Sequence, residues 1–172
     1  FTSRQAESAF AEIKLEVEQD NCTEETGKPV YTTVQEKKVY KKYASVYEEN
    51  TDFVGWLYIY GTRIDYPVMY TPENEEYYIH RNFQGGYSAA GTLFAAANCS
   101  PTGKVSDNVI IYGHNMKAGT MFHDLLKYED KDFYKEHQTI IFDTLDGPGT
   151  YIVIAAFYTK AYPEGDTEHY NI

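Results

Sequence analysis

Apolar residues recur every three or four positions near the start of the chain, which is the spacing of an amphipathic helix. A helix over residues 3–19 would collect on one face Ala6, Phe10, Ile13 and Val17. A polar stretch ends this pattern, and a second helix is predicted over roughly 34–49, with an apolar side formed by Val39, Tyr43 and Val46. We expect residues 1–50 to be a helical appendage that braces a main domain over residues 51–172.

From Phe53 onward the apolar residues alternate with polar ones, and Gly, Pro, Asn and Asp interrupt the pattern at short intervals. Alternation of period two is typical of strands with one buried face. Strands are expected near 56–60, 65–70, 91–96, 108–113, 138–144 and 149–158. Between 120 and 137 the spacing becomes helical again, so one or two short helices are predicted there. The fold class is therefore mainly β with a short helical insertion.

Composition and charge narrow the function classes. Eighteen tyrosines and nine phenylalanines among 172 residues suit half-buried sheet surfaces. A formal charge of −11 argues against a nucleic-acid partner, because phosphate contacts need a cationic surface. No run approaches the roughly 18 apolar residues that span a bilayer, and no signal peptide begins the chain. Any membrane anchor is expected to lie upstream of this sequence.

The segment from Asn108 to Met116 runs an apolar strand directly into a histidine, His114. A rigid strand end is a good place for a general base, and Gly113 is expected to let the chain turn so that the imidazole projects. The same residues also fit a histidine that only makes a hydrogen bond at a strand end. The residues by themselves leave both interpretations open.

Five blocks, in order along the chain, resemble the class B sortases, which are cell-surface cysteine transpeptidases of Gram-positive bacteria. They are Asp52–Leu57 with Gly61–Val68, Tyr77–Phe83, Gly91–Phe94, Tyr112–Met116 and Gly119–Phe122. The resemblance implies a closed β-barrel with N-terminal helices, and it aligns His114 with the catalytic histidine of the family. It also implies a domain on the outer face of the membrane, held by an N-terminal transmembrane helix that this chain does not contain.

The chain departs from the family in the residues that complete the chemistry. Sortases carry a nucleophilic cysteine in a strand downstream of the histidine and an arginine on the next strand. Here the cysteines are Cys22 and Cys99, and the arginines are Arg4, Arg63 and Arg81, all upstream of His114. We therefore expect a sortase barrel lacking its last two strands, which would be inactive alone. The alternative is a non-catalytic surface module with a degenerate barrel that binds peptide.

Cys99 is the one thiol in the apolar part of the chain, and strand geometry argues against its pairing with His114. If strands 91–96 and 108–113 are antiparallel neighbours, Cys99 and His114 lie at opposite ends, roughly 20 Å apart. A base must approach its thiol to about 3 to 4 Å. Cys99 is thus expected to be structural, and a disulfide between Cys22 and Cys99 stays possible.

By resemblance, Tyr112, Ile79 and, less securely, Asn74 would line the groove for the sorting-signal peptide, although each is also an ordinary core or loop residue. The second substrate would be an amine of peptidoglycan or of a pilin. No cofactor is implied, and the histidine spacing does not suggest a metal site. His80 is expected to be a packed core or rim residue, whereas His123 and His137 are expected at the surface or at helix ends.

Overall fold

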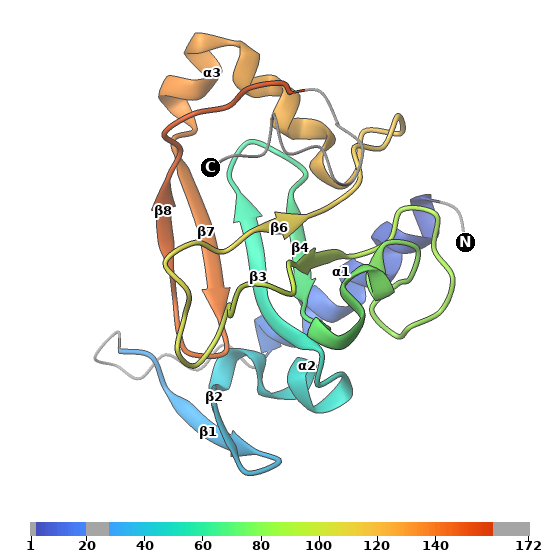
Figure 1. Cartoon of the computed structure of the whole chain (residues 1–172), viewed down its shortest axis with the longest axis vertical. Coiled ribbons are helices and arrows are strands. Elements are labelled where there is room, and N and C mark those ends of the chain that lie inside the picture. The colour runs from blue at the N-terminus through green and yellow to red at the C-terminus, as the bar shows by residue number, and fades with distance from the viewer. Residues whose placement is uncertain (1–2, 20–27, 160–172) are drawn as a thin grey trace.

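A six-stranded sheet forms the centre of the computed structural model, which describes residues 3–19 and 28–159 (Figure 1). The strand order is β6-β5-β4-β3-β7-β8, and every pair is antiparallel except β4 with β5. The strands are β3 (Phe53–Ile59), β4 (Asp65–Met69), β5 (Leu93–Ala95), β6 (Ile111–Tyr112), β7 (Thr139–Thr144) and β8 (Thr150–Ile152). All six predicted strands are confirmed, although β5, β6 and β8 are shorter than expected.

Strand β3 is the centre of this sheet and is buried along almost its whole length. It pairs with β4 on one side and with β7 on the other. Gly55 allows the close approach to β7, because a Cβ there would lie 2.4 Å from the carbonyl oxygen of Asp143. A strand buried between two neighbours needs an apolar sequence, and its residues supply one.

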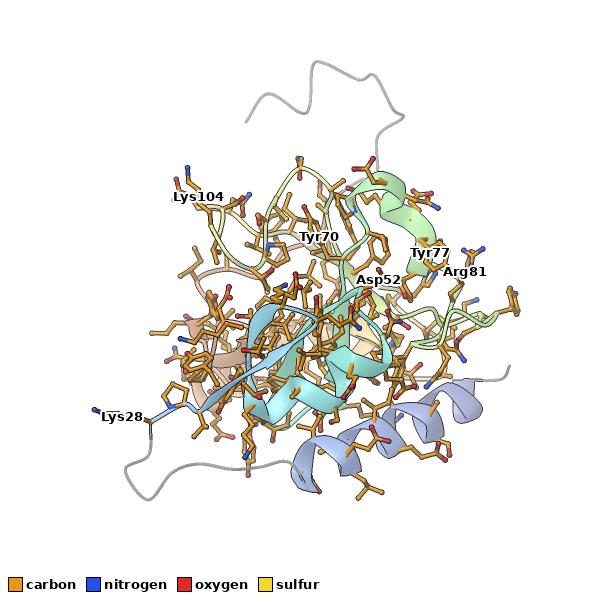
Figure 2. All side chains as sticks on the ribbon, turned by 90° about the horizontal axis from the view of Figure 1, so that it is seen from below. Lys28, Asp52, Tyr70, Tyr77, Arg81 and Lys104 are labelled. Atoms are coloured by element: carbon orange, nitrogen blue, oxygen red, sulfur yellow. The ribbon has the colours of Figure 1, made fainter. Side chains whose placement is uncertain are left out.

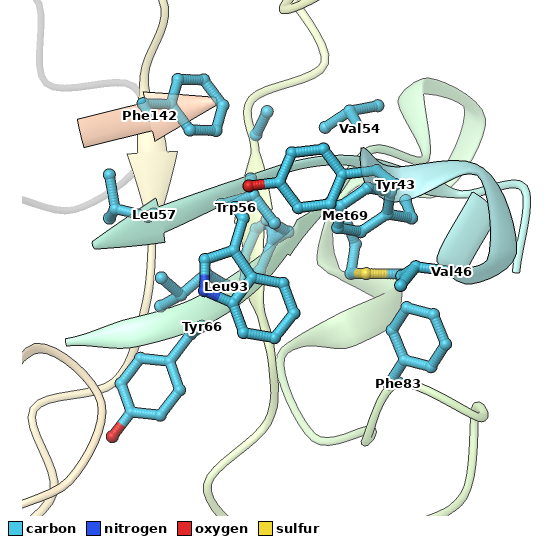
Figure 3. Close-up of a cluster of buried hydrophobic side chains, with 14 of the residues drawn as sticks. Tyr43, Val46, Val54, Trp56, Leu57, Tyr66, Met69, Phe83, Leu93 and Phe142 are labelled. Carbon is cyan, nitrogen blue, oxygen red and sulfur yellow. The ribbon is translucent and has the colours of Figure 1, made fainter. Parts of the chain in front are cut away.

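The core joins the sheet to the segments around it (Figure 3). Aromatic rings link its parts: Tyr43 packs on Phe53 at 5.5 Å between ring centroids, and Phe53 packs on Phe83 at 6.4 Å. Such tilted and edge contacts add to the stabilisation from buried area. The largest fully buried aliphatic side chains of this core include Ile59, Ile64, Met69, Leu93 and Leu145.

The first predicted helix is confirmed as α1 (Ser3–Gln19). Its face carrying Phe10, Ile13 and Val17 is buried. Phe10 packs edge-on against Tyr66 of β4, with 5.4 Å between centroids, and the Lys14 ammonium pairs with the Asp65 carboxylate. Figure 2 shows α1 as a separate layer along one side of the molecule. Helix α1 is therefore packed onto the main sheet.

The second predicted helix, over 34–49, is largely wrong. Its first part forms a hairpin of β1 (Tyr31–Val34) and β2 (Lys37–Tyr40). Gln35 and Glu36 make the two-residue turn with φ of 46° and 66°, without the glycine or asparagine that usually marks such a turn. Only the later part is helical, as the 3₁₀ segment η1 (Lys41–Tyr43) followed by α2 (Ala44–Glu49).

The predicted helical insertion is confirmed. It consists of η3 (Phe122–Glu129) and α3 (Lys131–Glu136). Asp130 caps α3 by accepting hydrogen bonds from the backbone N–H groups of Asp132 and Phe133. A further 3₁₀ segment, η2 (Pro72–Tyr78), lies between β4 and β5. Among the described residues, no helix has both the length and the apolar character needed to cross a membrane.

Within the described residues the sheet is open, with β6 and β8 as its edges, so the barrel expected from the resemblance is incomplete there. An apolar groove of about 460 Å³ lies between β6, with the loop before it, and strands β7 and β8. Its lining includes Leu57, Val109, Ile111 and Phe142. The segment after β8 also presents apolar side chains: Ile154 is 93% exposed and Phe157 is 82% exposed. Exposed apolar surface of this kind marks a face that another segment or partner covers.

We predict that the 172-residue chain, prepared alone, self-associates through this surface. Replacing Ile154 and Phe157 together by Ser should shift the chain toward monomer in sedimentation velocity, because it removes apolar area without disturbing buried contacts. The control is Leu15→Ser, which alters an exposed leucine on α1. A monodisperse wild-type monomer, or an equal effect of the control, would contradict the prediction.

Candidate functional site

His114 lies two residues after β6, and its half-buried imidazole contacts the segment after η2. Its Nε2 lies 2.9 Å from the carbonyl oxygen of Ile79, a hydrogen-bonding distance. The imidazole also stacks on that of His80, with 5.2 Å between centroids and 19° between planes. The structure therefore brings together His114 and Ile79, two of the residues that the sequence analysis selected.

Gly113 is needed here for space and not for a turn. Gly113 is not among the described glycines that have a positive φ. The expectation that it serves to let the chain turn is therefore wrong. A Cβ at this position would lie 2.3 Å from Leu93 Cδ2 and 2.9 Å from Phe122 Cδ2. The absence of a side chain lets the end of β6 pack closely on β5 and η3.

The loop after His114 is closed on itself and fastened to the sheet. The backbone N–H of Phe122 donates to the carbonyl of His114 at 2.9 Å, and the N–H of Met121 donates to the Tyr66 hydroxyl at 3.2 Å. The Arg63 guanidinium donates to the carbonyl of Gly119 at 3.3 Å. The position of His114 thus depends on β4 and on the β3–β4 turn as well as on β6.

Asp124, a buried carboxylate in η3, holds the β3–β4 turn against this loop. It accepts hydrogen bonds from the Arg63 backbone N–H at 2.7 Å and from the Lys127 ammonium at 3.0 Å. Burial alone would raise the pKa of Asp124, but these two donors more than offset it and lower that pKa below its usual value. The carboxylate is therefore a charged structural anchor beside the site.

The segment that meets the imidazole is anchored by Tyr78, which is 1% exposed. Its hydroxyl donates to the Asp52 carboxylate at 2.8 Å and accepts from the Asn50 amide at 2.9 Å. Burial raises the pKa of the Tyr78 hydroxyl far above its ordinary value, so the ring stays neutral. Tyr78 thus anchors in the core the segment that carries Ile79, the hydrogen-bond partner of His114.

The other two proposed groove residues lie less close to the imidazole. Tyr112 is 42% exposed on β6 and leans on Phe94, with 5.5 Å between centroids. Asn74 is exposed at a kink within η2, where its backbone exchanges hydrogen bonds with Thr71. Substrate binding by Tyr112, Ile79 and Asn74 stays a prediction.

The remaining described histidines behave as surface groups. His80 is exposed, so it is a rim residue and not a core residue, and its stacking on His114 was missed by sequence reasoning. No spacing signal could have revealed this contact between distant segments. His123 bonds to Asn115, and His137 ends α3, as expected. Among the described residues, no group of three His, Cys, Asp or Glu side chains is placed to hold a metal ion.

Cys99 is buried and its thiol donates to the carbonyl of Ala96 at 3.1 Å. The antiparallel pairing of β5 with β6 is confirmed, with Phe94 opposite Tyr112. Cys99 follows β5 and His114 follows β6, so the two residues lie beyond opposite ends of this pair. Cys22, the other cysteine, is outside the described residues.

Arg63 and Arg81 both have backbone partners. Arg63 bonds to the loop after His114, whereas Arg81 donates to the carbonyl of Tyr77 at 2.8 Å and lies over the Tyr77 ring, 4.2 Å from its centroid (Figure 2). These contacts give each guanidinium a structural function.

Comparison with known proteins identifies relatives of this site and fold, although no family model matches the chain. Sortase B of Listeria monocytogenes is 46% identical over 96 residues, which are 55% of this chain and 38% of that protein. Sortase B of Staphylococcus aureus is 30% identical over 124 residues, which are 72% of this chain and 50% of that protein. A solved sortase B from Bacillus anthracis has a TM-score of 0.73 at 27% identity, over 96% of this chain and 75% of that one.

The chain is therefore similar in sequence and in fold to the sortases, the family that the five blocks indicated. Within them its relatives are sortases of class B. It spans half or less of the length of the two curated relatives.

We predict that Gly113→Ala lowers the free energy of unfolding by about 1 to 3 kcal/mol, the usual cost of overpacking. The added methyl group would overlap the Leu93 side chain, as described above. The matched control is Gly86→Ala, where the nearest atom is 3.3 Å away, and it should cost less. Urea unfolding of both variants measures the difference, and equal losses would refute the close-packing explanation.

For Asp124→Asn we expect a loss of about 1 to 2 kcal/mol at neutral pH, because a charged acceptor of two donors is removed. Since folding lowers the pKa of Asp124, its stabilisation is present above the ordinary carboxyl pKa of about 4 and disappears as the pH falls through the folded value. The stability difference between variant and parent should therefore shrink in acid.

Thermal melts across pH 3 to 7, a range set around the ordinary carboxyl pKa of about 4, measure this difference. Asp132→Asn is the matched control, because Asp132 also pairs with a lysine three residues later but is 82% exposed. It should change stability by less than about 0.5 kcal/mol. A pH-independent deficit for Asp124→Asn would show that the carboxylate charge is unimportant.

Proposed function

We propose that the complete protein is a sortase-type cysteine transpeptidase in which His114 is the acid/base or the ion-pair partner of a thiolate. The observation that carries the proposal is the imidazole of His114, held at the end of β6 by the Ile79 carbonyl in a sortase-family fold. A positioned imidazole can exchange protons near neutral pH.

The proposed reaction needs a cysteine and an arginine from outside the described residues. The thiolate attacks the carbonyl carbon of the threonine in a sorting signal, and the peptide C–N bond breaks. The departing amine takes a proton from the His114 imidazolium. The acceptor amine then attacks the thioester, gives its proton to His114 and releases the thiolate. The arginine would stabilise the oxyanion, and no cofactor is required.

The proposed substrates are the C-terminal sorting signal of a surface protein and an amine of peptidoglycan or of a pilin. Tyr112, Ile79 and Asn74 would line the peptide groove, which is consistent with the exposure of Tyr112 and the contact of Ile79 with His114. Such an enzyme would work on the outer face of the cell membrane, held there by an N-terminal transmembrane helix upstream of this chain.

His114→Ala in the complete protein should lower kcat/KM for a fluorogenic sorting-signal peptide by at least about 10²-fold. The melting temperature should change by only a few degrees, because the imidazole is partly exposed. Cys99→Ala is the control and should leave cleavage unchanged, since that thiol lies at the far end of the strand pair. Near-normal cleavage by His114→Ala would refute the assignment.

The 172-residue chain alone should give no cleavage and no thioacyl adduct by intact mass, because neither of its cysteines is expected to reach His114. Turnover by the chain alone that is lost in Cys99→Ala would instead establish an internal dyad. If the complete protein binds the peptide without any turnover, the alternative of a non-catalytic peptide-binding module would be correct.

A further inference from the structure

The segment 78–81 presents four successive carbonyls, and each has a hydrogen-bond donor. The backbone N–H of Thr92 donates to Tyr78, the N–H of Ser88 donates to His80, and the Thr92 hydroxyl donates to Arg81, at 3.0, 3.0 and 2.9 Å. The fourth carbonyl, that of Ile79, has the His114 imidazole as its partner. Because its neighbours are held, the Ile79 carbonyl has a fixed direction.

Packing around Gly91 supports the same conclusion. Gly91 has a φ of 63°, and a Cβ there would lie 2.3 Å from the carbonyl oxygen of Ile79. The carbonyl therefore occupies space that a side chain at residue 91 would fill. Since β5 begins just after this glycine, the carbonyl is seated against a fixed part of the sheet.

A carbonyl oxygen can only accept a hydrogen bond, so the nitrogen that faces it must carry the proton. His114 therefore has its proton on Nε2 when the imidazole is neutral. Within the described part of the chain, Nδ1 has no hydrogen-bond partner, so it is the nitrogen left to accept a proton. In the imidazolium, the Nε2 proton stays directed at Ile79 and the Nδ1 proton is the one that can be transferred.

The His80 imidazole restrains the remaining freedom of the His114 imidazole, which is rotation about the side-chain bonds. The two rings are nearly parallel, and the carbonyl of His80 is itself held by Ser88. One short segment thus supplies both a hydrogen bond to the edge of the His114 ring and a stacking contact on its face. These are the two contacts needed to define the position of a planar ring.

We propose that Ile79 and His80 form a positioning device for His114, in which the Ile79 carbonyl selects the Nε2–H tautomer and His80 orients the ring, making Nδ1 the reactive nitrogen. This proposal rests on the proposed function of His114, but the tautomer is a property of the resting protein and can be measured separately. His80 acts here through His114 and is a positioning residue.

The first experiment determines the tautomer by NMR. In the complete protein labelled with ¹⁵N-histidine, long-range ¹H–¹⁵N correlations are recorded at a pH where the His114 imidazole is neutral, and His114→Gln assigns its signals. The expected result is a protonated Nε2 and an unprotonated Nδ1. A protonated Nδ1 in neutral His114 would overturn the proposal even if the enzyme is active.

The second experiment compares His80→Ala with His80→Phe in the complete protein. His80→Ala should lower kcat by about threefold to tenfold with little change in KM, and should mix the His114 tautomers, because the stacking ring is lost. His80→Phe keeps a ring in place and should restore kcat and the single tautomer. The control is Tyr60→Ala, which removes another exposed ring stacked on a histidine, His137, at 5.8 Å and also 19°.

Equal kcat and tautomer signals in the parent, His80→Ala and Tyr60→Ala proteins would show that His80 does not position His114. A decrease in kcat of the same size for both His80 variants would mean that the imidazole itself, and not stacking, is required, which also contradicts the proposal. If His114→Ala retains activity while the Nε2–H tautomer is observed, the proposed function fails but the positioning contact stands.

Discussion

The pairing of β3 with both β4 and β7 is the constraint on which the other contacts depend. The side chains of β3 are buried on both faces, and a change of register would place a residue with a Cβ against the Asp143 carbonyl, where Gly55 now lies. Strand β4 then pairs with β5, and β5 pairs with β6, which ends two residues before His114. The catalytic candidate is therefore placed by a series of backbone ladders that begins at the centre of the sheet. On the other side of β3, Gly55 makes the pairing with β7 possible by leaving room for Asp143.

The candidate site is built mainly from backbone groups on rigid segments. The Ile79 carbonyl meets the imidazole, and the loop after His114 is closed by its own backbone hydrogen bonds. Charged and phenolic side chains stabilise the segments around the imidazole. Asp124 holds the β3–β4 turn, and Tyr78 fixes the segment facing His114. This arrangement suits a catalytic imidazole whose partners come from another part of the protein, since the ring can be in position before those partners contribute.

The sequence was sufficient to predict all six strands, because period-two alternation or a short apolar run, bounded by turn residues, marks each of them. It also located His114, through the blocks that resemble sortases. The β1–β2 hairpin was missed because its turn, Gln35-Glu36, contains no residue typical of positive φ. The function of Gly113 was misjudged because a glycine required by a neighbour such as Leu93 looks the same in sequence as one required by a turn. The His80 contact could not be predicted, since it depends on how the segment after η2 packs against the segment after β6.

The lengths of the strand ladders differ across the sheet, and this has a consequence for local opening. Strand β3 has seven residues and long neighbours on both sides, whereas β5 has three residues and β6 has two. Native-state hydrogen exchange should therefore protect β3 most, while the amides around β6 should exchange through smaller and less costly openings. The half of the sheet that presents the imidazole is thus the half best able to separate and close again without unfolding the centre. A binding event that pairs with β6 would slow exchange there first.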